Sequence, residues 1–252
     1  MRQAIGLARR FLFAGKAYRA FLEMASRQWL ARPSGECPCC GYRGRFQIEP
    51  HLQLAESCPG CGSLERQRLL ALAARRGFLD FAGCDVLQFA PDPAVSALID
   101  AQSPASHVTA DYEPDRAQVR LDIEALALGD AAFDRVVCSH VLEHVDDRKA
   151  LAEIYRVLRP SGEALIMLPV VEGWAQSYEN PAVSSTAERI SHFGQWDHVR
   201  VFGADIRERI AAAGFDLAEF TAGGEDAVTF RLLRGEKVFR ATKPDQPCRP
   251  RG

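Results

Sequence analysis

The chain has 252 residues, of which 47% are hydrophobic and 25% charged, and its formal net charge is −2. This length allows one α/β domain with a sizeable core plus a smaller module. The balanced charge disfavours a general polyanion binder, and no apolar run approaches the ~20 residues that a membrane-spanning helix needs. Because the N-terminus also lacks the apolar core and cleavage site of a secretory signal, we expect a cytoplasmic protein.

Residues 1–33 are predicted to form a basic amphipathic helix. Apolar side chains recur in three- and four-residue steps, and arginines and lysines far outnumber the single acid, Glu23. The pattern fits a helix lying on an anionic membrane surface, which would make residues 1–32 a peripheral membrane contact. It fits nearly as well a helix docked on the rest of the chain or on a second subunit, and a partly frayed helix in solvent is the third possibility.

Residues 34–63 contain two cysteine knuckles of the pattern C-P-x-C-G, Cys37 with Cys40 and Cys58 with Cys61. Two such knuckles can supply four thiolates to one tetrahedral zinc ion, and the glycine after each pair permits the sharp turn. We predict a structural zinc-ribbon module with these four ligands, and Cys39 is then a spare thiol. A helix leaves directly from the second knuckle, so the module is expected to brace the following domain or an entrance to its site.

Residues 64–243 alternate between strand and helix patterns. Ser63 is the predicted N-cap of a helix over 64–78, residues 172–197 are predicted to be irregular, and residues 244–252 form a disordered tail. The predicted strands are 85–89, 107–111, 118–122, 133–139, 163–168, 215–220 and 236–242, and the predicted helices between them are 93–101, 147–158 and 205–213. This alternation predicts a Rossmann-like α/β fold, with a doubly wound, mostly parallel seven-stranded sheet.

Polar residues follow the ends of three predicted strands, where an open α/β sheet binds its ligands. Asp111 is placed to accept hydrogen bonds from both ribose hydroxyls of a nucleoside. Asp122, or the backbone beside it at Ile123, can meet an adenine amino group. Ser139 and His140 end the next strand, beside the position of a transferred group. An aspartate at a strand end is also commonly a turn former, so this site depends on its context.

Three segments supply that context, residues 122–126 (DIEAL), 133–145 (FDRVVCSHVLEHV) and 153–162 (EIYRVLRPSG). In order and spacing they resemble the core of class I S-adenosylmethionine-dependent methyltransferases, specifically the type 11-like group. The resemblance covers about residues 84–243. It implies a methyltransferase that uses S-adenosylmethionine, with Asp111 on the ribose and Asp122 on the adenine.

The loop after the first strand departs from that family, because its G-x-G-x-G falls on residues 90–94 (APDPA). Glycines there let the backbone approach the ligand and donate amides, whereas Pro91 and Pro93 have no amide hydrogen. Asp92 still suits a helix N-cap and can meet the donor's amino group. We expect donor binding with altered contacts, and a non-catalytic scaffold stays an alternative. The predicted donor contacts are Phe89, Ala90, Pro91, Asp92, Asp111, Asp122, Ile123, Ser139 and His140.

Methyl transfer is an in-line displacement, so the protein must hold the acceptor ~3–3.5 Å from the methyl carbon and exclude water. An oxygen or nitrogen acceptor often also needs a base, for which His140 is the first candidate and His198 the second. Glu143 and His144 are more typical of surface or capping roles. The predicted acceptor contacts are His192, Gln195, Asp197 and Arg200. A structural network in which Arg200 pairs with a carboxylate is an equal alternative.

The expected acceptor is an oxygen or nitrogen of a small molecule, or of a glycan or lipid-linked intermediate if residues 1–32 touch a membrane. A zinc ribbon ahead of a methyltransferase also resembles ribosomal RNA methyltransferases, which makes RNA an alternative acceptor. Nucleic acid is the less favoured partner, because Arg43 and Arg45 are opposed within the module by Glu36, Glu49 and Glu56.

Overall fold

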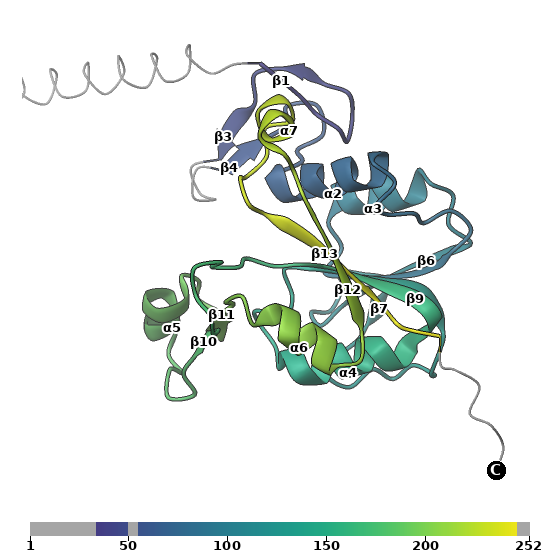
Figure 1. Ribbon diagram of the computed structural model, residues 1–252, viewed down its shortest axis with the longest axis vertical. Coiled ribbons are helices and arrows are strands. Elements are labelled where there is room, and N and C mark those ends of the chain that lie inside the picture. The colour runs from purple at the N-terminus through teal and green to yellow at the C-terminus, as the bar shows by residue number, and fades with distance from the viewer. Residues whose placement is uncertain (1–33, 50–54, 246–252) are drawn as a thin grey trace, which may run out of the picture.

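The computed structural model describes residues 34–49 and 55–245. The predicted basic helix of residues 1–33 and all but the start of the predicted tail lie outside these ranges. A central sheet carries helices on both faces, and the cysteine module sits above the helices of one face (Figure 1). Among the described helices, none has the length and apolar character needed to cross a membrane.

The central sheet has seven strands in the order β12-β13-β9-β8-β5-β6-β7. Only β13 runs antiparallel to its neighbours. This confirms the predicted Rossmann-like, mostly parallel sheet. The strand order reverses between β5 and β8, and a ligand site is expected at their carboxyl ends. The strands are β5 (Asp85–Phe89), β6 (Ser106–Asp111), β7 (Val119–Arg120), β8 (Phe133–Ser139), β9 (Leu158–Met167), β12 (Asp216–Thr221) and β13 (Lys237–Thr242).

Helices cover both faces of the sheet because its central strands are apolar on both sides. In β8, Val136 packs into the core on one face and Val137 into the core on the other, as alternating side chains require. The first core is closed by α4 (Asp147–Val157) and α6 (Ile206–Ala212), and the second by α2 (Glu65–Arg75), α3 (Pro93–Asp100) and α7 (Gly224–Thr229). Figure 1 shows the two groups of helices on opposite sides of the sheet.

The start of α2 differs from the prediction, because its N-cap is Leu64 and not Ser63. The Leu64 amide donates to the Gln67 side chain at 2.5 Å. The Ser63 hydroxyl is used elsewhere, at 3.3 Å from the Cys37 sulfur and 3.2 Å from the Cys61 sulfur. A hydroxyl held between two cysteine sulfurs cannot also cap the helix.

The segment predicted to be irregular contains a strand, β10 (Tyr178–Glu179), and a helix, α5 (Thr186–Phe193). Ser185 and Glu188 form a capping box at the start of α5, and Gly194 ends the helix with a φ of 83°. In the sequence, the S-x-x-E pattern of Ser185 and Glu188, followed by Gly194, indicates this helix. β10 pairs with β11 (Arg200–Val201), and together with α5 they lie beyond one end of the sheet (Figure 1).

The cysteine module consists of two short hairpins joined to α2. β1 (Gly35–Glu36) pairs with β2 (Arg43–Gly44), and β3 (Gln47–Glu49) pairs with β4 (Ala55–Ser57). Arg68 of α2 is fully buried and donates to four backbone carbonyls, two from the module and two from the end of α7. The buried guanidinium therefore links the module to the domain, beside ion pairs such as Arg231–Glu56 at 2.7 Å.

Candidate functional site

A hollow of about 240 Å³ lies at the carboxyl ends of β5 and β8, where the strand order reverses. It brings together six of the predicted donor contacts from two strand ends and the loop into α3. Two residues of α2, Arg66 and Gln67, close its other side. The predicted residues that line it are Phe89, Ala90, Pro91, Asp92, Ser139 and His140.

Two non-glycine residues of this hollow have left-handed backbones, Ala90 with φ 46° and His140 with φ 56°. L-residues reach this region at a cost of roughly 1–2 kcal/mol, and such strain gathers at functional sites. Ala90 stands where the family has its first glycine, so the turn keeps the conformation that a glycine would favour. Its amide donates to the Ala110 carbonyl at 2.9 Å, which fixes the turn against β6.

We predict that Ala90→Gly will raise the free energy of unfolding by up to about 1 kcal/mol. Glycine removes the ~1–2 kcal/mol cost of the left-handed backbone. Its greater conformational entropy in the unfolded state opposes this gain by ~0.5–1 kcal/mol. Ala97→Gly in the middle of α3 is the control and should lose ~1 kcal/mol, because Ala97 has ordinary helical geometry. Urea denaturation of both variants measures the two effects, and equal losses would contradict the strain at Ala90.

The two predicted nucleoside carboxylates lie at the ends of neighbouring strands on the same edge of the sheet. Asp111 follows Ala110, the partner of Phe89 in the β5–β6 pairing, and Leu121 donates its amide to the Asp111 carbonyl at 3.0 Å. The Oδ1 atoms of Asp111 and Asp122 each accept the amide two residues on, at 2.9 Å. The Oδ2 atoms of the two aspartates take no part in these two hydrogen bonds. Ile123 is buried in the core, so only its backbone can face a ligand.

Asp92 has two partners within the protein. Its Oδ1 accepts the Ala94 amide at 2.9 Å, which confirms the predicted N-cap of α3. Its Oδ2 accepts the Gln67 side-chain amide at 2.6 Å. The bond to Gln67 joins the donor loop to α2 and competes with the predicted contact to a donor amino group.

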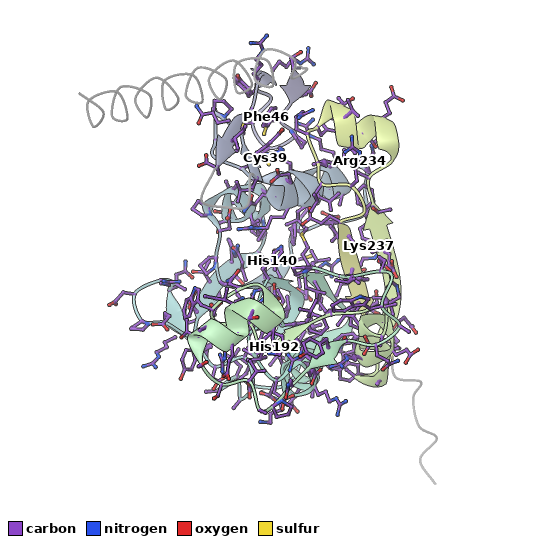
Figure 2. All side chains as sticks on the ribbon, turned by 90° about the vertical axis from the view of Figure 1, so that its left-hand side faces the viewer. Cys39, Phe46, His140, His192, Arg234 and Lys237 are labelled. Atoms are coloured by element: carbon purple, nitrogen blue, oxygen red, sulfur yellow. The ribbon has the colours of Figure 1, made fainter. Side chains whose placement is uncertain are left out.

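His140 and Glu143 form a hydrogen-bonded pair beside the hollow. Nδ1 of His140 lies 3.1 Å from Oε1 of Glu143, and Glu143 is 2% exposed. If Nδ1 carries the proton and donates to the carboxylate, Nε2 keeps a lone pair. Nε2 is buried and has no hydrogen-bond partner in the described part of the chain. Figure 2 shows His140 in the middle of the molecule, between the module and the lower helices.

Two further charged residues belong to this region and were not predicted from the sequence. Arg66 lines the hollow from α2. Burial raises the pKa of Glu236, while the charge of Arg66 acts in the opposite direction. Oε2 of Glu236 is a buried atom with no partner among the described residues. Glu236 directly precedes β13, whose antiparallel direction brings its start to the carboxyl edge of the sheet.

The predicted acceptor contacts separate into exposed and buried groups. His192 is exposed and pairs with the Tyr178 hydroxyl at 2.6 Å, and Gln195 donates to Asp197 at 2.9 Å. Arg200 is buried and donates to the Leu142 and Val145 carbonyls. It also pairs with Asp147 and Glu179, at 3.4 and 3.3 Å. The geometry of Arg200 therefore favours the structural network, the alternative stated from the sequence.

His198, the second predicted base, lies behind His140 and outside the residues that line the hollow. Its ring meets the ring of His144 edge-on, with centroids 4.7 Å apart. Burial lowers the pKa of His198. His144 in turn lies 3.2 Å from Asp197.

The four predicted cysteine ligands converge, with all four sulfurs within 4.8 Å of one another. The Cys37 and Cys61 sulfurs are 3.7 Å apart and those of Cys40 and Cys58 are 3.6 Å apart. A tetrahedral zinc ion with bonds of ~2.3 Å places its sulfurs ~3.8 Å apart, whereas a disulfide would require ~2.05 Å. The donor set therefore fits zinc.

The two knuckles have the same backbone geometry. In each, the glycine amide donates to the carbonyl of the first cysteine, at 2.8 Å for Gly41 and 2.7 Å for Gly62. Both glycines have positive φ, 76° and 72°. The glycines are thus needed for the turns that bring the sulfurs together.

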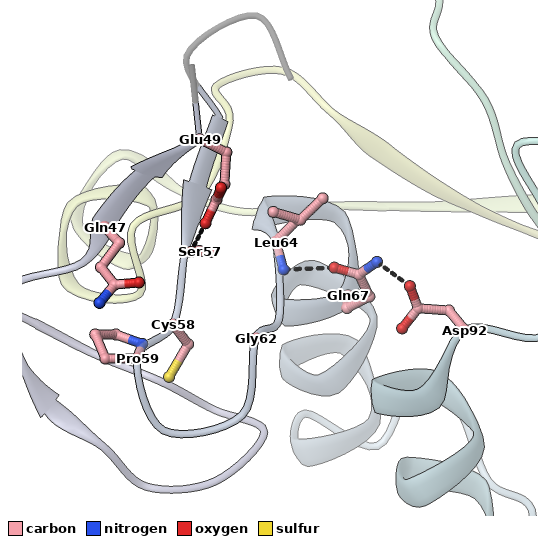
Figure 3. Close-up of a pocket in the computed structure, with 9 residues that line it drawn as sticks. All are labelled: Gln47, Glu49, Ser57, Cys58, Pro59, Gly62, Leu64, Gln67 and Asp92. Carbon is pink, nitrogen blue, oxygen red and sulfur yellow. Dashed lines mark hydrogen bonds between the residues drawn. The ribbon is translucent and has the colours of Figure 1, made fainter. Parts of the chain in front are cut away.

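A second hollow of about 360 Å³ lies between the module and the start of α2 (Figure 3). Gln47, Glu49 and Ser57 of the module line one side, and Glu49 accepts a hydrogen bond from Ser57 at 2.5 Å. Gln67 and Asp92 line the other side and also line the first hollow. The two hollows therefore adjoin at the Gln67–Asp92 bond.

Comparison with known proteins agrees with this fold. Residues 58–166 match the family described as Methyltransferase domain. Over 65 residues the chain is 37% identical to the ubiquinone/menaquinone biosynthesis C-methyltransferase UbiE of Klebsiella pneumoniae, a match covering 24% of this chain and 26% of the relative. The chain thus spans about a quarter of the length of the curated relatives that it matches.

Solved structures share the fold at low sequence identity. An S-adenosylmethionine-dependent methyltransferase from Mesorhizobium loti matches with a TM-score of 0.51 at 12% identity, over 69% of this chain and 97% of that one. A chain from a Haloferax volcanii complex between the Trm112 methyltransferase activator and a methyltransferase matches with a TM-score of 0.50 at 17% identity, over 71% and 91%.

These findings define the class of the protein as an α/β protein of the Rossmann-like fold, which it shares with a methyltransferase of known structure. The match over residues 58–166 agrees with the methyltransferase resemblance predicted for residues 84–243, which it overlaps.

Proposed function

We propose that this chain transfers a methyl group from S-adenosylmethionine to an oxygen or nitrogen atom of a small molecule, or of a glycan or lipid-linked intermediate. The observation that carries the proposal is His140 at the hollow where β5 and β8 end, whose Nε2 has no hydrogen-bond partner among the described residues. A neutral imidazole in this position can take the proton of a hydroxyl or amine acceptor. Glu143 orients the ring through Nδ1.

The donor would extend from the first hollow along the carboxyl edge of the sheet to the ends of β6 and β7. Asp111 and Asp122, which lie outside the lining of the hollow, would offer their Oδ2 atoms to the ribose and the adenine. Arg66 offers a guanidinium for the donor carboxylate, which the proline-containing loop cannot bind through glycine amides. S-adenosylmethionine, when bound, supplies the electrophilic methyl carbon, and the chain's own part is to orient the partners, exclude water and accept a proton.

The acceptor would enter through the second hollow, beside the donor. Gln47, Glu49 and Ser57 offer an amide, a carboxylate and a hydroxyl, which suit an acceptor rich in hydroxyl groups. This arrangement supports the expectation that the module borders the acceptor entrance. His192, Gln195 and Asp197 remain proposed contacts for a more distant part of the acceptor.

Donor binding tests the cofactor assignment. We predict that Asp111→Ala and Asp122→Ala each weaken the binding of S-adenosylmethionine, because each removes a charged hydrogen-bond acceptor that contributes ~1.5–3 kcal/mol. Arg66→Ala should weaken the binding of S-adenosylmethionine and leave the binding of 5′-methylthioadenosine unchanged, because 5′-methylthioadenosine lacks the amino-acid end. Calorimetry with both ligands measures the three variants.

The control for these variants is Asp216→Ala. Asp216 is exposed at the amino end of β12, on the opposite edge of the sheet, and should not affect either ligand. Normal affinity for both ligands in the Asp111→Ala, Asp122→Ala double variant would remove the nucleoside site.

The four thiolates of Cys37, Cys40, Cys58 and Cys61 are proposed to hold a structural zinc ion. We predict that Cys58→Ser with Cys61→Ser abolishes the zinc retained by the thiolates, because two ligands are lost. The matched control is Cys39→Ser, which should keep zinc, since Cys39 contacts the Gln67 carbonyl at 3.7 Å and belongs to neither pair. Metal analysis of the purified chain after gel filtration measures both.

The acceptor class is tested by transfer of labelled methyl groups to a cell extract. The proposal expects label in small or solvent-extractable molecules, and lipid-linked label would agree with a peripheral, cytoplasmic enzyme that touches membrane through residues 1–32. Label that is lost on treatment with ribonuclease would instead establish the RNA alternative. An extract left unlabelled by protein that binds S-adenosylmethionine would indicate the non-catalytic scaffold.

A further inference from the structure

Three metal-ligand side chains converge next to His140, one of them its partner Glu143. Glu143, His144 and His198 each offer one ligand atom, and these atoms lie within 4.8 Å of one another. Glu143 is 2% exposed, and its Oε2 has no hydrogen-bond partner among the described residues. A buried carboxylate oxygen without a partner carries a desolvation penalty that a bound cation would offset.

Each of two ligands is already oriented by a partner outside the cluster. His144 points Nδ1 at Asp197, 3.2 Å away, which leaves Nε2 for a metal. Oε1 of Glu143 is held by His140 at 3.1 Å, which leaves Oε2. A carboxylate behind a ligating imidazole is the usual outer partner in metal sites, where it fixes the tautomer and the ring.

The two chain segments that supply the ligands are fixed to each other. Glu143 and His144 lie in the turn between β8 and α4, and His198 precedes β11. The Val199 amide donates to the Glu143 carbonyl at 2.9 Å, and buried Arg200 donates to the carbonyls on either side, Leu142 and Val145. The cluster is therefore preorganised by bonds that are independent of any ligand.

We propose that Glu143, His144 and His198 bind a divalent transition-metal ion at a second site, separate from the four thiolates. Two imidazoles and one carboxylate favour zinc, cobalt or nickel over magnesium or calcium. Three protein ligands leave one position open, the arrangement of a catalytic and not a structural metal. Resting on the proposed function, we assign that open position to an oxygen of the acceptor other than the methylated atom, since Glu143 joins the metal site to the Nδ1 edge of the proposed base His140.

The site is tested by titrating Co²⁺ into the full-length chain after it has been loaded with one equivalent of zinc. We expect one further equivalent to bind, with visible d–d bands and without the near-ultraviolet charge transfer of thiolate ligands. His198→Ala and Glu143→Gln should abolish this binding. Asp197→Ala should weaken it ~10–100-fold, the effect usual for an outer partner.

His192→Ala is the matched control, because His192 lies in the same region but pairs with Tyr178, and it should keep the second equivalent. A thermal melt on each sample shows that the variants fold, and added Co²⁺ should raise Tm in the unsubstituted chain but not in His198→Ala. No uptake beyond the first zinc, or equal uptake in His198→Ala, would overturn the site. Calorimetry with S-adenosylmethionine on the same samples reports separately on the proposed function.

Discussion

Arg68→Met is expected to lower the free energy of unfolding by about 3–5 kcal/mol, the range for breaking a buried charged network. The guanidinium is fully buried. It donates to the Glu56 carbonyl at 2.9 Å and the Ser63 carbonyl at 2.5 Å on the module side. On the other side it donates to Phe230 at 3.0 Å and Arg231 at 2.5 Å. Methionine fills most of the volume but leaves these carbonyls unpaired.

Urea denaturation measures this loss, and Arg75→Met provides the comparison on the same helix. Arg75 is exposed and lies 3.5 Å from Glu36, so its ion pair should contribute only ~0–1 kcal/mol. Equal small losses in both variants would mean that the module is attached mainly by other contacts, such as the Arg231–Glu56 pair at 2.7 Å. A large loss for Arg68→Met alone establishes the buried guanidinium as the attachment.

Most of the fold could be predicted because its signals are local. The β5 and β8 strands match their predicted ranges, since each is an apolar run between turn residues. The Cys37–Cys40 and Cys58–Cys61 knuckles could be predicted for the same reason. The role of Arg68 could not, because two of its partners lie 162 and 163 residues further along the chain. A contact between residues so far apart in the chain leaves no periodic pattern in the sequence.

The site residues also divide into those indicated by a local sequence pattern and those placed by contacts between distant segments. His140 could be predicted because it directly follows a strand, and Ala90 because it occupies the place of a family glycine. The pairing of His140 with Glu143, and the approach of His198 to His144, depend on how the β8–α4 turn meets the segment before β11. Arg66 and Glu236 come from elements far apart in the sequence, and only the sheet order places them at the same edge.

His140→Gly is expected to lower kcat by ~10²–10⁴-fold, the usual contribution of a positioned general base, with a much smaller effect on the affinity for S-adenosylmethionine, whose proposed hollow His140 also lines. Glycine is the suitable replacement, because residue 140 has a φ of 56° and glycine adopts this backbone without strain. The relief of backbone strain offsets part of the cost of losing the bond to Glu143, and a thermal melt shows whether the variant folds. Single-turnover methyl transfer and calorimetry together measure the two quantities.

Rescue distinguishes a base from a structural residue at this position. His140→Gly removes the ring next to a hollow of about 240 Å³, so added imidazole can occupy the space and restore part of the rate. Rescue should increase with pH as the added imidazole loses its proton near its ordinary pKa, since only the neutral form accepts a proton. An Asp216→Ala control should lose no activity. A His140→Gly enzyme with full kcat, or a loss that imidazole leaves unchanged at every pH, would assign the proton transfer elsewhere, with Glu236 as the next buried group at the same edge.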